Sequence, residues 1–326
     1  MAVAVAVAVS GSVAVAVRPC PAMHSGSSLA CRLQPPACHL LSSAPMPLPQ
    51  DLTRELETAR AVALEAAALV ASFKGRPLEV RHKGGGEPVS RADIESSELI
   101  VRRMRAAFPG DAILSEELPD DHSRLDNPRV WMIDPIDGTS DFLRGEPGYV
   151  VMIGLCVEGR PTVGAVAQPT TGHLWMGAVG AGAWKEQPGA AREMLRVSGV
   201  GETHAIRLVS SKSHRSEYYE RFRHALGITD ELALGSVGLK VALIAEGSRD
   251  LYVYPGSQTK IWDSCGPEAI LTAAGGMVTD SDGGALQYTL PALHNPRGMI
   301  ASNGLVHRQA IDAVARLRAE TTPARG

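Results

Sequence analysis

Aromatic side chains and cysteines are both scarce in this chain. Phe, Trp and Tyr make up only 4% of its 326 residues, whereas glycine and proline number 33 and 22. The core must therefore be built mainly from Ala, Val, Ile and Leu, with many tight turns between the elements. Cys20, Cys31 and Cys38 lie near the N-terminus, which leaves Cys156 and Cys265 for the rest of the chain. A disulfide-stapled fold is excluded, and we interpret Cys156 and Cys265 as small buried apolar residues.

A strong excess of one charge is also lacking. The net charge is −3, the pI is about 6.4, and Lys and Arg form no basic stripe. No nucleic-acid partner is therefore expected. With 44% hydrophobic and 21% charged residues the composition is that of a globular protein, and the length suits two domains of ordinary size. We expect a monomer that does not associate with membranes, although no sequence feature fixes the oligomeric state.

Acidic residues are absent from the first fifty positions, which differ in composition from the rest. Residues 1–17 are almost entirely Ala and Val, but Ser10, Gly11 and Ser12 interrupt the run, and no basic residue precedes it. A secretory signal and a membrane span are therefore both disfavoured, whereas an organelle transit peptide stays open. We predict that residues 1–50 are a disordered or misassigned extension, with Met46 as an alternative start, and that the protein is cytoplasmic.

Hydrophobic periodicity divides the remaining chain into an α+β domain over 51–189, expected to bind metal, and an α/β domain over 190–320. Apolar residues at three- and four-residue steps predict helices over 52–70 and 90–108. Between them the run of three glycines at 84–86 predicts a mobile loop. Short apolar runs bounded by turn residues predict strands at 112–114, 130–133, 150–157, 162–167, 174–178, 207–209 and 251–254.

The stretch from Asp134 to Ser140 reads Asp-Pro-Ile-Asp-Gly-Thr-Ser and places two carboxylates at the end of a buried strand. Pro135 biases Asp134 toward an extended conformation. A short helix predicted over 140–143 would leave free backbone N–H groups beside Asp137. Carboxylate oxygens hold Mg²⁺, and an open helix N-terminus holds an anion such as phosphate. Taken alone, however, the motif is better explained by a helix cap at Asp137 and a turn at Asp134.

Two further acidic groups favour a metal site over a helix cap and a turn. Glu116 and Glu117 follow a second buried strand, where they could also form a solvated loop. Asp263 lies just before a helix that is predicted to start around Pro267 and to end at Gly275, and it could be a cap. Carboxylates a few ångströms apart repel one another strongly at intermediate dielectric, so converging clusters need neutralising charge. Divalent cations are the simplest source of that charge.

The ordered set of acidic motifs resembles the inositol monophosphatase superfamily of Mg²⁺-dependent, lithium-sensitive phosphatases. The resemblance extends over about 51–304 and includes the Trp262-Asp263 pair. Within that superfamily, three stretches resemble the 3′(2′),5′-bisphosphate nucleotidases, which convert 3′-phosphoadenosine 5′-phosphate to AMP and so clear a by-product of sulfate activation. These stretches are Ser211-Lys212-Ser213-His214, Ser236-Val237-Gly238-Leu239-Lys240 and Ile261-Trp262-Asp263 with the helix after it.

The resemblance implies an α+β fold of the layered αβαβα sandwich type, with a pocket between the two domains and two or three Mg²⁺ ions. The implied metal ligands are Glu116, Asp134, the Ile136 carbonyl, Asp137 and Asp263. Asp93 would pair with Thr139 to activate the attacking water. The implied substrate contacts are the N–H groups of Gly138, Thr139 and Ser140 on the scissile phosphate, and His214, Ser236 and Lys240 on the rest of the nucleotide.

The expected function is therefore Mg²⁺-dependent hydrolysis of the 3′-phosphate of 3′-phosphoadenosine 5′-phosphate, a small phosphorylated nucleotide, by metal-activated water. Where some relatives carry a basic residue for the second phosphate, this chain has Tyr254. An inositol phosphate or sugar bisphosphate phosphatase of the same fold stays open, as does a non-catalytic module that senses nucleotide or metal. Alone, His214 would fit a helix-start residue, and Lys240 in its apolar run either reaches the surface or meets an anion.

Overall fold

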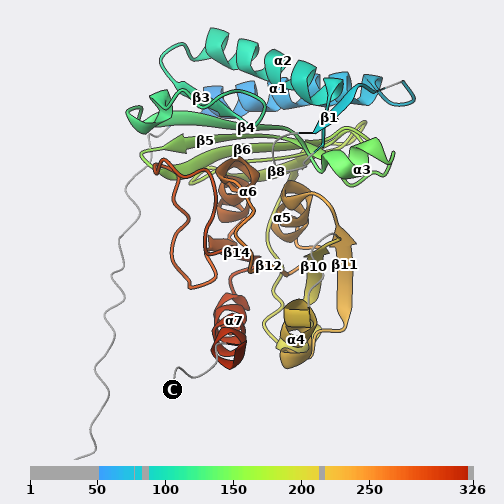
Figure 1. Ribbon diagram of the computed structural model, residues 1–326, viewed down its shortest axis with the longest axis vertical. Helices are drawn as coiled ribbons and strands as arrows, with labels where there is room; N and C mark the ends of the chain where they lie inside the picture. The colour runs from blue at the N-terminus through green and yellow to red at the C-terminus, as the bar shows by residue number, and fades with distance from the viewer. Residues whose placement is uncertain (1–50, 77, 83–87, 213–216, 322–326) are drawn as a thin grey trace, which may run out of the picture. The chain divides into compact units, whose positions relative to one another are not determined.

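Helices and sheets alternate in layers through the described part of the chain (Figure 1). The computed structural model describes residues 51–76, 78–82, 88–212 and 217–321. The N-terminal extension, the glycine loop at 84–86 and His214 lie outside the described residues, so the predictions for them stay predictions. Within the described residues, no helix has both the length and the apolar character needed to cross a membrane.

Seven described strands form the first sheet, which contains five of the predicted strands. In spatial order they are β3 (Ala112–Ser115), β4 (Arg129–Asp137), β5 (Val150–Val157), β6 (Arg160–Gln168), β7 (His173–Ala178), β8 (Gly182–Glu186) and β9 (Glu193–Met194). β3 and β4 pair in parallel, and the other neighbours pair antiparallel. The parallel pair matters most for function, because the carboxyl ends of β3 and β4 meet at one edge of the sheet.

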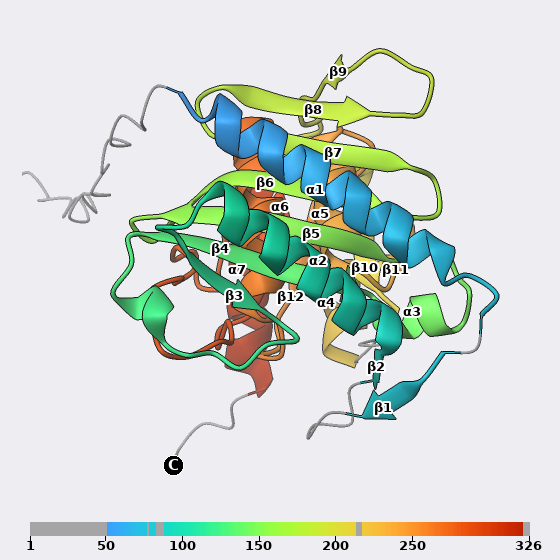
Figure 2. The same ribbon diagram turned by 90° about the horizontal axis from the view of Figure 1, so that it is seen from above.

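Two long helices, α1 (Thr53–Ser72) and α2 (Arg91–Ala107), cover one face of this sheet (Figure 2). Their apolar stripes bury against the strands in one core, which confirms the two predicted helices. α2 begins with a capping box in which Ser90 and Asp93 bond to each other's backbone or side chain. The start of α2 is therefore fixed beside the end of β4, where the acidic motif lies.

The opposite face of the first sheet packs on α5 (Val237–Ala245) and α6 (Ile261–Ala273) (Figure 1). α6 begins earlier than predicted and contains Pro267, which cannot donate a hydrogen bond to the carbonyl four residues before it. Tight packing explains why the helix nevertheless continues. A Cβ on Gly154 would lie 2.4 Å from the Gly266 nitrogen, and one on Gly164 would lie 2.1 Å from the Gly266 oxygen. Asp263 is consequently in the first turn of α6 and not before it.

A second sheet lies beyond α5 and α6, and two more helices cover its far face. Its five described strands are, in spatial order, β11 (Asp230–Leu234), β10 (Arg207–Ser211), β12 (Leu251–Tyr254), β14 (Met299–Ser302) and β13 (Met277–Thr279). The covering helices are α4 (Glu217–Ala225) and α7 (His307–Thr321). The described chain is therefore an α+β sandwich with αβαβα layering, as expected. Its short elements are β1 (Val80–His82), β2 (Pro88–Ser90), α3 (Thr139–Leu143), η1 (Ser123–Leu125) and η2 (Thr203–Ala205).

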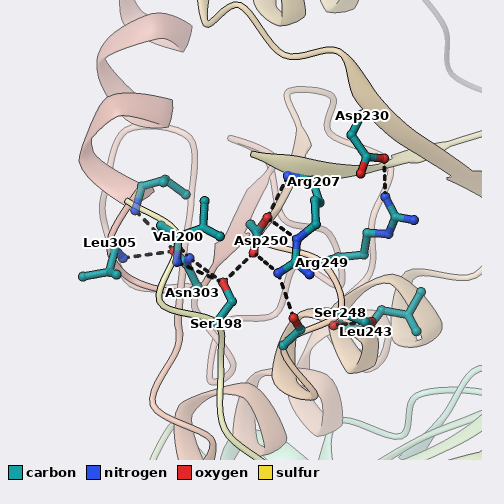
Figure 3. A network of polar contacts seen from close by, with 12 residues as sticks. Ser198, Val200, Arg207, Asp230, Leu243, Ser248, Arg249, Asp250, Asn303 and Leu305 are labelled. Atoms are coloured by element: carbon teal, nitrogen blue, oxygen red, sulfur yellow. Dashed lines mark hydrogen bonds and ion pairs between the residues drawn. The ribbon is translucent and has the colours of Figure 1, made fainter. Parts of the chain in front are cut away.

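The chain passes from the first sheet to the second between the end of β9 and the start of β10, close to the predicted domain boundary near 190. A buried polar network holds this passage (Figure 3). Ser198 and Arg207 both donate hydrogen bonds to Asp250, and Asn303 donates to Ser198 and to the Val200 carbonyl. All described residues belong to one compact unit, and division into two domains stays a prediction.

Candidate active site

The carboxyl ends of β3 and β4 bring the first two acidic groups together. Ser115 pairs with Ile133 across the parallel strands, so Glu116 and Asp134 follow at neighbouring positions. The Glu116 backbone N–H continues the pairing with a 3.1 Å hydrogen bond to the Ile133 carbonyl. Asp134 is only 2% exposed. Two acids that sequence analysis assigned to separate strand ends therefore share one edge of the sheet.

Three of the predicted ligands each have one carboxylate oxygen held by the chain. Asp134 accepts a hydrogen bond from the Ile136 N–H at 3.0 Å, and Asp263 accepts one from the Lys260 N–H at 2.7 Å. Asp137 Oδ2 accepts two, from the Ser236 hydroxyl at 2.6 Å and from a backbone N–H of α5 at 2.7 Å. The other oxygen of each side chain receives no hydrogen bond from the described residues. Backbone N–H groups, joined at Asp137 by the Ser236 hydroxyl, thus orient each acid and leave one oxygen for an external ligand.

The charges of these acids raise one another's pKa values. Burial raises the pKa of Asp134 well above its ordinary value, and the charges of Glu116, Asp137 and Asp263 raise it further. Burial also raises the pKa of Asp137, against the opposing charge of Lys240. Burial and then the charge of Asp137 raise the pKa of Asp263 well above its usual range. Mutual repulsion of this kind favours either protonation or a bound cation.

The donor set suits Mg²⁺, which prefers carboxylate and carbonyl oxygens. Carboxylate oxygens of the acidic groups and the Ile136 carbonyl are all of this type. In the described parts of the chain, however, no three His, Cys, Asp or Glu side chains are gathered tightly enough to form a ready-made metal cluster. Acids without a counter-ion repel one another, so a bound cation would have to draw these side chains together. The chemistry of the donors fits the ion, and the assignment of each ligand stays a prediction.

The predicted catalytic pair is in contact. Thr139, the first residue of α3, donates its hydroxyl hydrogen to Asp93 Oδ1 at 3.1 Å, with the Ile136 carbonyl 3.0 Å away. Asp93 Oδ2 accepts hydrogen bonds from the Ser90 N–H and hydroxyl at 2.8 and 2.7 Å. Burial raises the pKa of Asp93, although hydrogen bonds from Ser90 and Thr139 oppose the rise. A buried acid is thereby placed one hydrogen bond away from a hydroxyl at the edge of the acidic cluster.

The start of α3 has backbone geometry that fits the predicted phosphate site, and the phosphate contacts stay a prediction. Gly138 has φ +95°, a left-handed conformation that favours glycine, and a Cβ there would lie 3.0 Å from the Gly148 oxygen. The chain can therefore turn sharply from β4 into α3. The N–H groups of Thr139 and Ser140 lie in the first helical turn, where no carbonyl of the same helix can accept from them. Ser140 is exposed, as a residue facing a soluble ligand would be.

Ser236 and Lys240, predicted to contact substrate, are both completely buried. The Lys240 ammonium donates to the carbonyl oxygens of Leu234 and Gly235 at 3.2 and 2.8 Å and lies 5.1 Å from the Tyr252 ring centre. Burial lowers the pKa of Lys240 to about 8, against the opposing charge of Asp137. Contact of either side chain with substrate stays a prediction, since both have hydrogen-bond partners inside the protein.

An ionic cluster behind the cradle was not found from the sequence. Asp141 is 2% exposed and forms ion pairs with Arg144 and, at 3.3 Å, with Lys212 at the end of β10. Lys212 also lies 2.6 Å from Glu146. The only sequence signal was the presence of Lys212 beside His214 in the nucleotidase-like stretch. The cluster joins the segment after the acidic motif to the second sheet.

Comparisons with known proteins agree with this geometry. The model of the inositol monophosphatase family matches residues 51–321. The 3′(2′),5′-bisphosphate nucleotidase CysQ of Salmonella typhimurium is 34% identical over 215 residues, covering 66% of this chain and 85% of that protein. The histidinol-phosphatase of Mycobacterium tuberculosis is 33% identical over 248 residues, covering 73% of this chain and 89% of that protein.

A solved structure supports the fold independently. The Thermotoga maritima IMPase superimposes with a TM-score of 0.70 at 26% identity, covering 82% of this chain and 98% of that one. Proteins of this family are generally metal-dependent, typically on Mg²⁺. The family match spans both sheets and all the acidic motifs described above. This chain is therefore a phosphatase that belongs to the inositol monophosphatase family.

Proposed function

We propose that this phosphatase removes the 3′-phosphate of 3′-phosphoadenosine 5′-phosphate in a Mg²⁺-dependent reaction that yields AMP and phosphate. The observation that carries the proposal is the contact between Asp93 and Thr139 beside several crowded acids. A protein that only bound nucleotide would have no use for such a pair. The similarity to the Salmonella nucleotidase supports the choice of substrate.

Two or three Mg²⁺ ions would be held by the predicted ligands Glu116, Asp134, the Ile136 carbonyl, Asp137 and Asp263. When bound, Mg²⁺ would supply the positive charge that neutralises these acids, binds phosphate oxygens and lowers the pKa of water. The N–H groups of Gly138, Thr139 and Ser140 would hold the phosphate and stabilise the charge that develops on it.

Asp93 and Thr139 would move the proton. The oxygen of the attacking water bonds to phosphorus while the bond from phosphorus to the 3′-oxygen breaks, and the leaving 3′-oxygen takes up a proton from solvent to become the hydroxyl of AMP. The proton that leaves the water passes to the Thr139 oxygen, and the Thr139 hydroxyl hydrogen passes along its existing hydrogen bond to Asp93. The raised pKa of Asp93 makes its carboxylate a better proton acceptor near neutral pH.

A phosphate-release panel tests the substrate. It compares 3′-phosphoadenosine 5′-phosphate with inositol 1-phosphate, fructose 1,6-bisphosphate and histidinol phosphate, each with and without Mg²⁺. We expect kcat/KM to be at least about tenfold higher for the nucleotide, and no release after chelation. Preference for another phosphate ester would overturn the proposed substrate. Nucleotide binding in calorimetry without any phosphate release would favour a non-catalytic sensor.

Histidinol phosphate is in the panel because a specific observation favours it. The mycobacterial histidinol-phosphatase matches a larger share of this chain than the Salmonella nucleotidase does. Both candidate reactions use the same acids and the same proton path, so they differ only in what the remainder of the pocket recognises.

Thr139→Val tests the proton path with Thr139→Ser as its matched control. Valine keeps the shape of threonine but has no hydroxyl, so we expect kcat to fall by about 10²- to 10⁴-fold with little change in KM. Serine keeps the hydroxyl and should retain most of the rate. Equal rates in both variants would exclude a role for the hydroxyl.

A further inference from the structure

The first turn of α5 reaches a predicted metal ligand from a distant part of the chain. Ser236, the N-cap of α5, accepts a hydrogen bond from the Leu239 N–H at 2.9 Å and donates its hydroxyl hydrogen to Asp137 Oδ2 at 2.6 Å. The Gly238 N–H donates to the same oxygen at 2.7 Å. A serine hydroxyl has one hydrogen to donate. Because Asp137 takes that hydrogen and the side chain is 0% exposed, none is left for a substrate.

The turn is held firmly in this position. A Cβ on Gly238 would lie 2.2 Å from Met152 Sδ, so glycine allows α5 to approach β5 closely. On the other side, a Cβ on Gly235 would lie 2.5 Å from Asp141 Oδ2. The buried Lys240 ammonium donates to the carbonyls of Leu234 and Gly235 and braces the turn from behind. Ser236 therefore has little freedom to turn its hydroxyl elsewhere.

We propose that Ser236 is a positioning residue that orients Asp137 for its cation and does not contact substrate. Because Ser236 and Gly238 both donate to Oδ2, Asp137 would have only Oδ1 to offer to a cation. The inference rests on the cation site of the proposed function. A residue of the second half of the chain would then orient an acid of the first sheet.

The test compares Ser236→Ala, Ser236→Thr and the matched control Ser210→Ala. Ser210 is also buried, at 1% exposure, and its hydroxyl also donates to a carboxylate, that of Glu231. Mn²⁺ binding to the full metal-free chain is measured by calorimetry, without substrate. Loss of a side chain that orients a metal ligand typically costs 10- to 100-fold in metal affinity. We expect Ser236→Ala to weaken Mn²⁺ binding by about tenfold, and Ser236→Thr and Ser210→Ala to bind within about threefold of the original chain.

Steady-state kinetics provide the second readout. We expect Ser236→Ala to raise the Mg²⁺ concentration for half-maximal rate by about tenfold, with the substrate KM at saturating Mg²⁺ unchanged. Unaltered Mn²⁺ affinity together with a raised KM would overturn the proposal and restore Ser236 as a substrate contact. If Ser236→Ala does not fold, Ser236→Cys replaces it, because cysteine keeps the size of serine but is a weak hydrogen-bond donor. We expect an intermediate loss of Mn²⁺ affinity in this variant. Normal Mn²⁺ affinity would count against the proposal. Absence of phosphate release with intact Mn²⁺ binding would reject the proposed function and leave this inference testable by calorimetry.

Discussion

Two groups of buried carboxylates in this protein differ in how their charge is compensated. Asp250, completely buried beside the second sheet, accepts hydrogen bonds from Nη2 and Nε of Arg207 at 2.7 and 2.9 Å (Figure 3). Burial alone would raise the pKa of Asp250, but the hydrogen bonds from Arg207 and Ser198 outweigh it and lower the pKa below its ordinary value. The chain itself supplies the cation for this acid.

Within the part of the chain that the structure describes, Asp134 and Asp137 at the end of β4 form no ion pair of this kind. Burial raises the pKa of Asp134 well above its ordinary value, and the charges of four neighbouring acids raise it further. The charge of Lys240 opposes the rise for Asp137, but the Lys240 ammonium donates its hydrogen bonds to backbone carbonyls. The charge of Asp250 is therefore compensated inside the protein, whereas the proposed function compensates the acids of the candidate site with a cation from outside.

The largest effect is expected from Asp137→Asn. The substitution removes a charge from the cation site, so we expect turnover to fall by at least about 10³-fold even at saturating Mg²⁺. Circular dichroism checks that the variant folds. Near-normal phosphate release from this variant would show that Asp137 is no ligand.

Asp250→Asn should weaken the fold and not the chemistry. The substitution leaves the Arg207 guanidinium without its counter-ion, and because this guanidinium is one-third exposed we expect a loss of only about 2 kcal/mol in the free energy of unfolding. Urea denaturation measures the loss, and kcat at a temperature where the variant is folded should be unchanged. A fall in kcat without a loss of stability would contradict the distinction between the two groups.

Asp134→Asn should have the opposite effect on stability. In metal-free protein at pH 7 it relieves a buried, repelled charge, so we expect the free energy of unfolding to rise by about 1 kcal/mol while activity is lost. A folded-state pKa above the unfolded value means that ionisation penalises the fold at high pH. The gain over the original chain should therefore shrink as the pH is lowered toward 4. A destabilised variant would mean that Asp134 already has a compensating partner.

The smallest effect concerns His307, which is buried against neutral hydroxyls. Its ring nitrogens lie 2.9 Å from the Thr279 hydroxyl and 2.8 Å from the Ser302 hydroxyl, and burial lowers its pKa to about 4. Below pH 6.5, the unfolded pKa of His307, the unfolded chain binds a proton that the folded chain does not bind. The free energy of unfolding therefore decreases as the pH is lowered. We expect a loss of about 1 kcal/mol between pH 7 and 5.5 that His307→Gln abolishes. An equal loss of stability in the original chain and in His307→Gln would show that other groups cause the loss.

Local patterns predicted most of the elements but few of the contacts. The helices and strands around the acidic motif follow from apolar periodicity, and the parallel ends of β3 and β4 bring Glu116 and Asp134 together as expected. The early start of α6 was missed because Pro267 was interpreted as the first residue of the helix, whereas α6 begins at Ile261 and packs closely on Gly154 and Gly164.

Long-range pairs left no periodic signal in the sequence. Ser236 and Asp137 are 99 positions apart, and Arg207 and Asp250 are 43 positions apart. Their residue types fit equally well with an exposed cap or a surface ion pair, so only the fold reveals that they meet. The roles of Ser236 and Lys240 inside the protein were hidden for the same reason.

Calorimetric titration of Mg²⁺ into the metal-free protein at pH 7, repeated in two buffers of different ionisation enthalpy, tests most directly whether the acids share a cation. Acids with raised pKa values hold protons that a cation must displace, so binding should release protons and its heat should depend on the buffer. Asp134→Asn should bind more weakly and release fewer protons. No binding, or binding with the same heat in both buffers, would contradict a cation site built from these repelling acids.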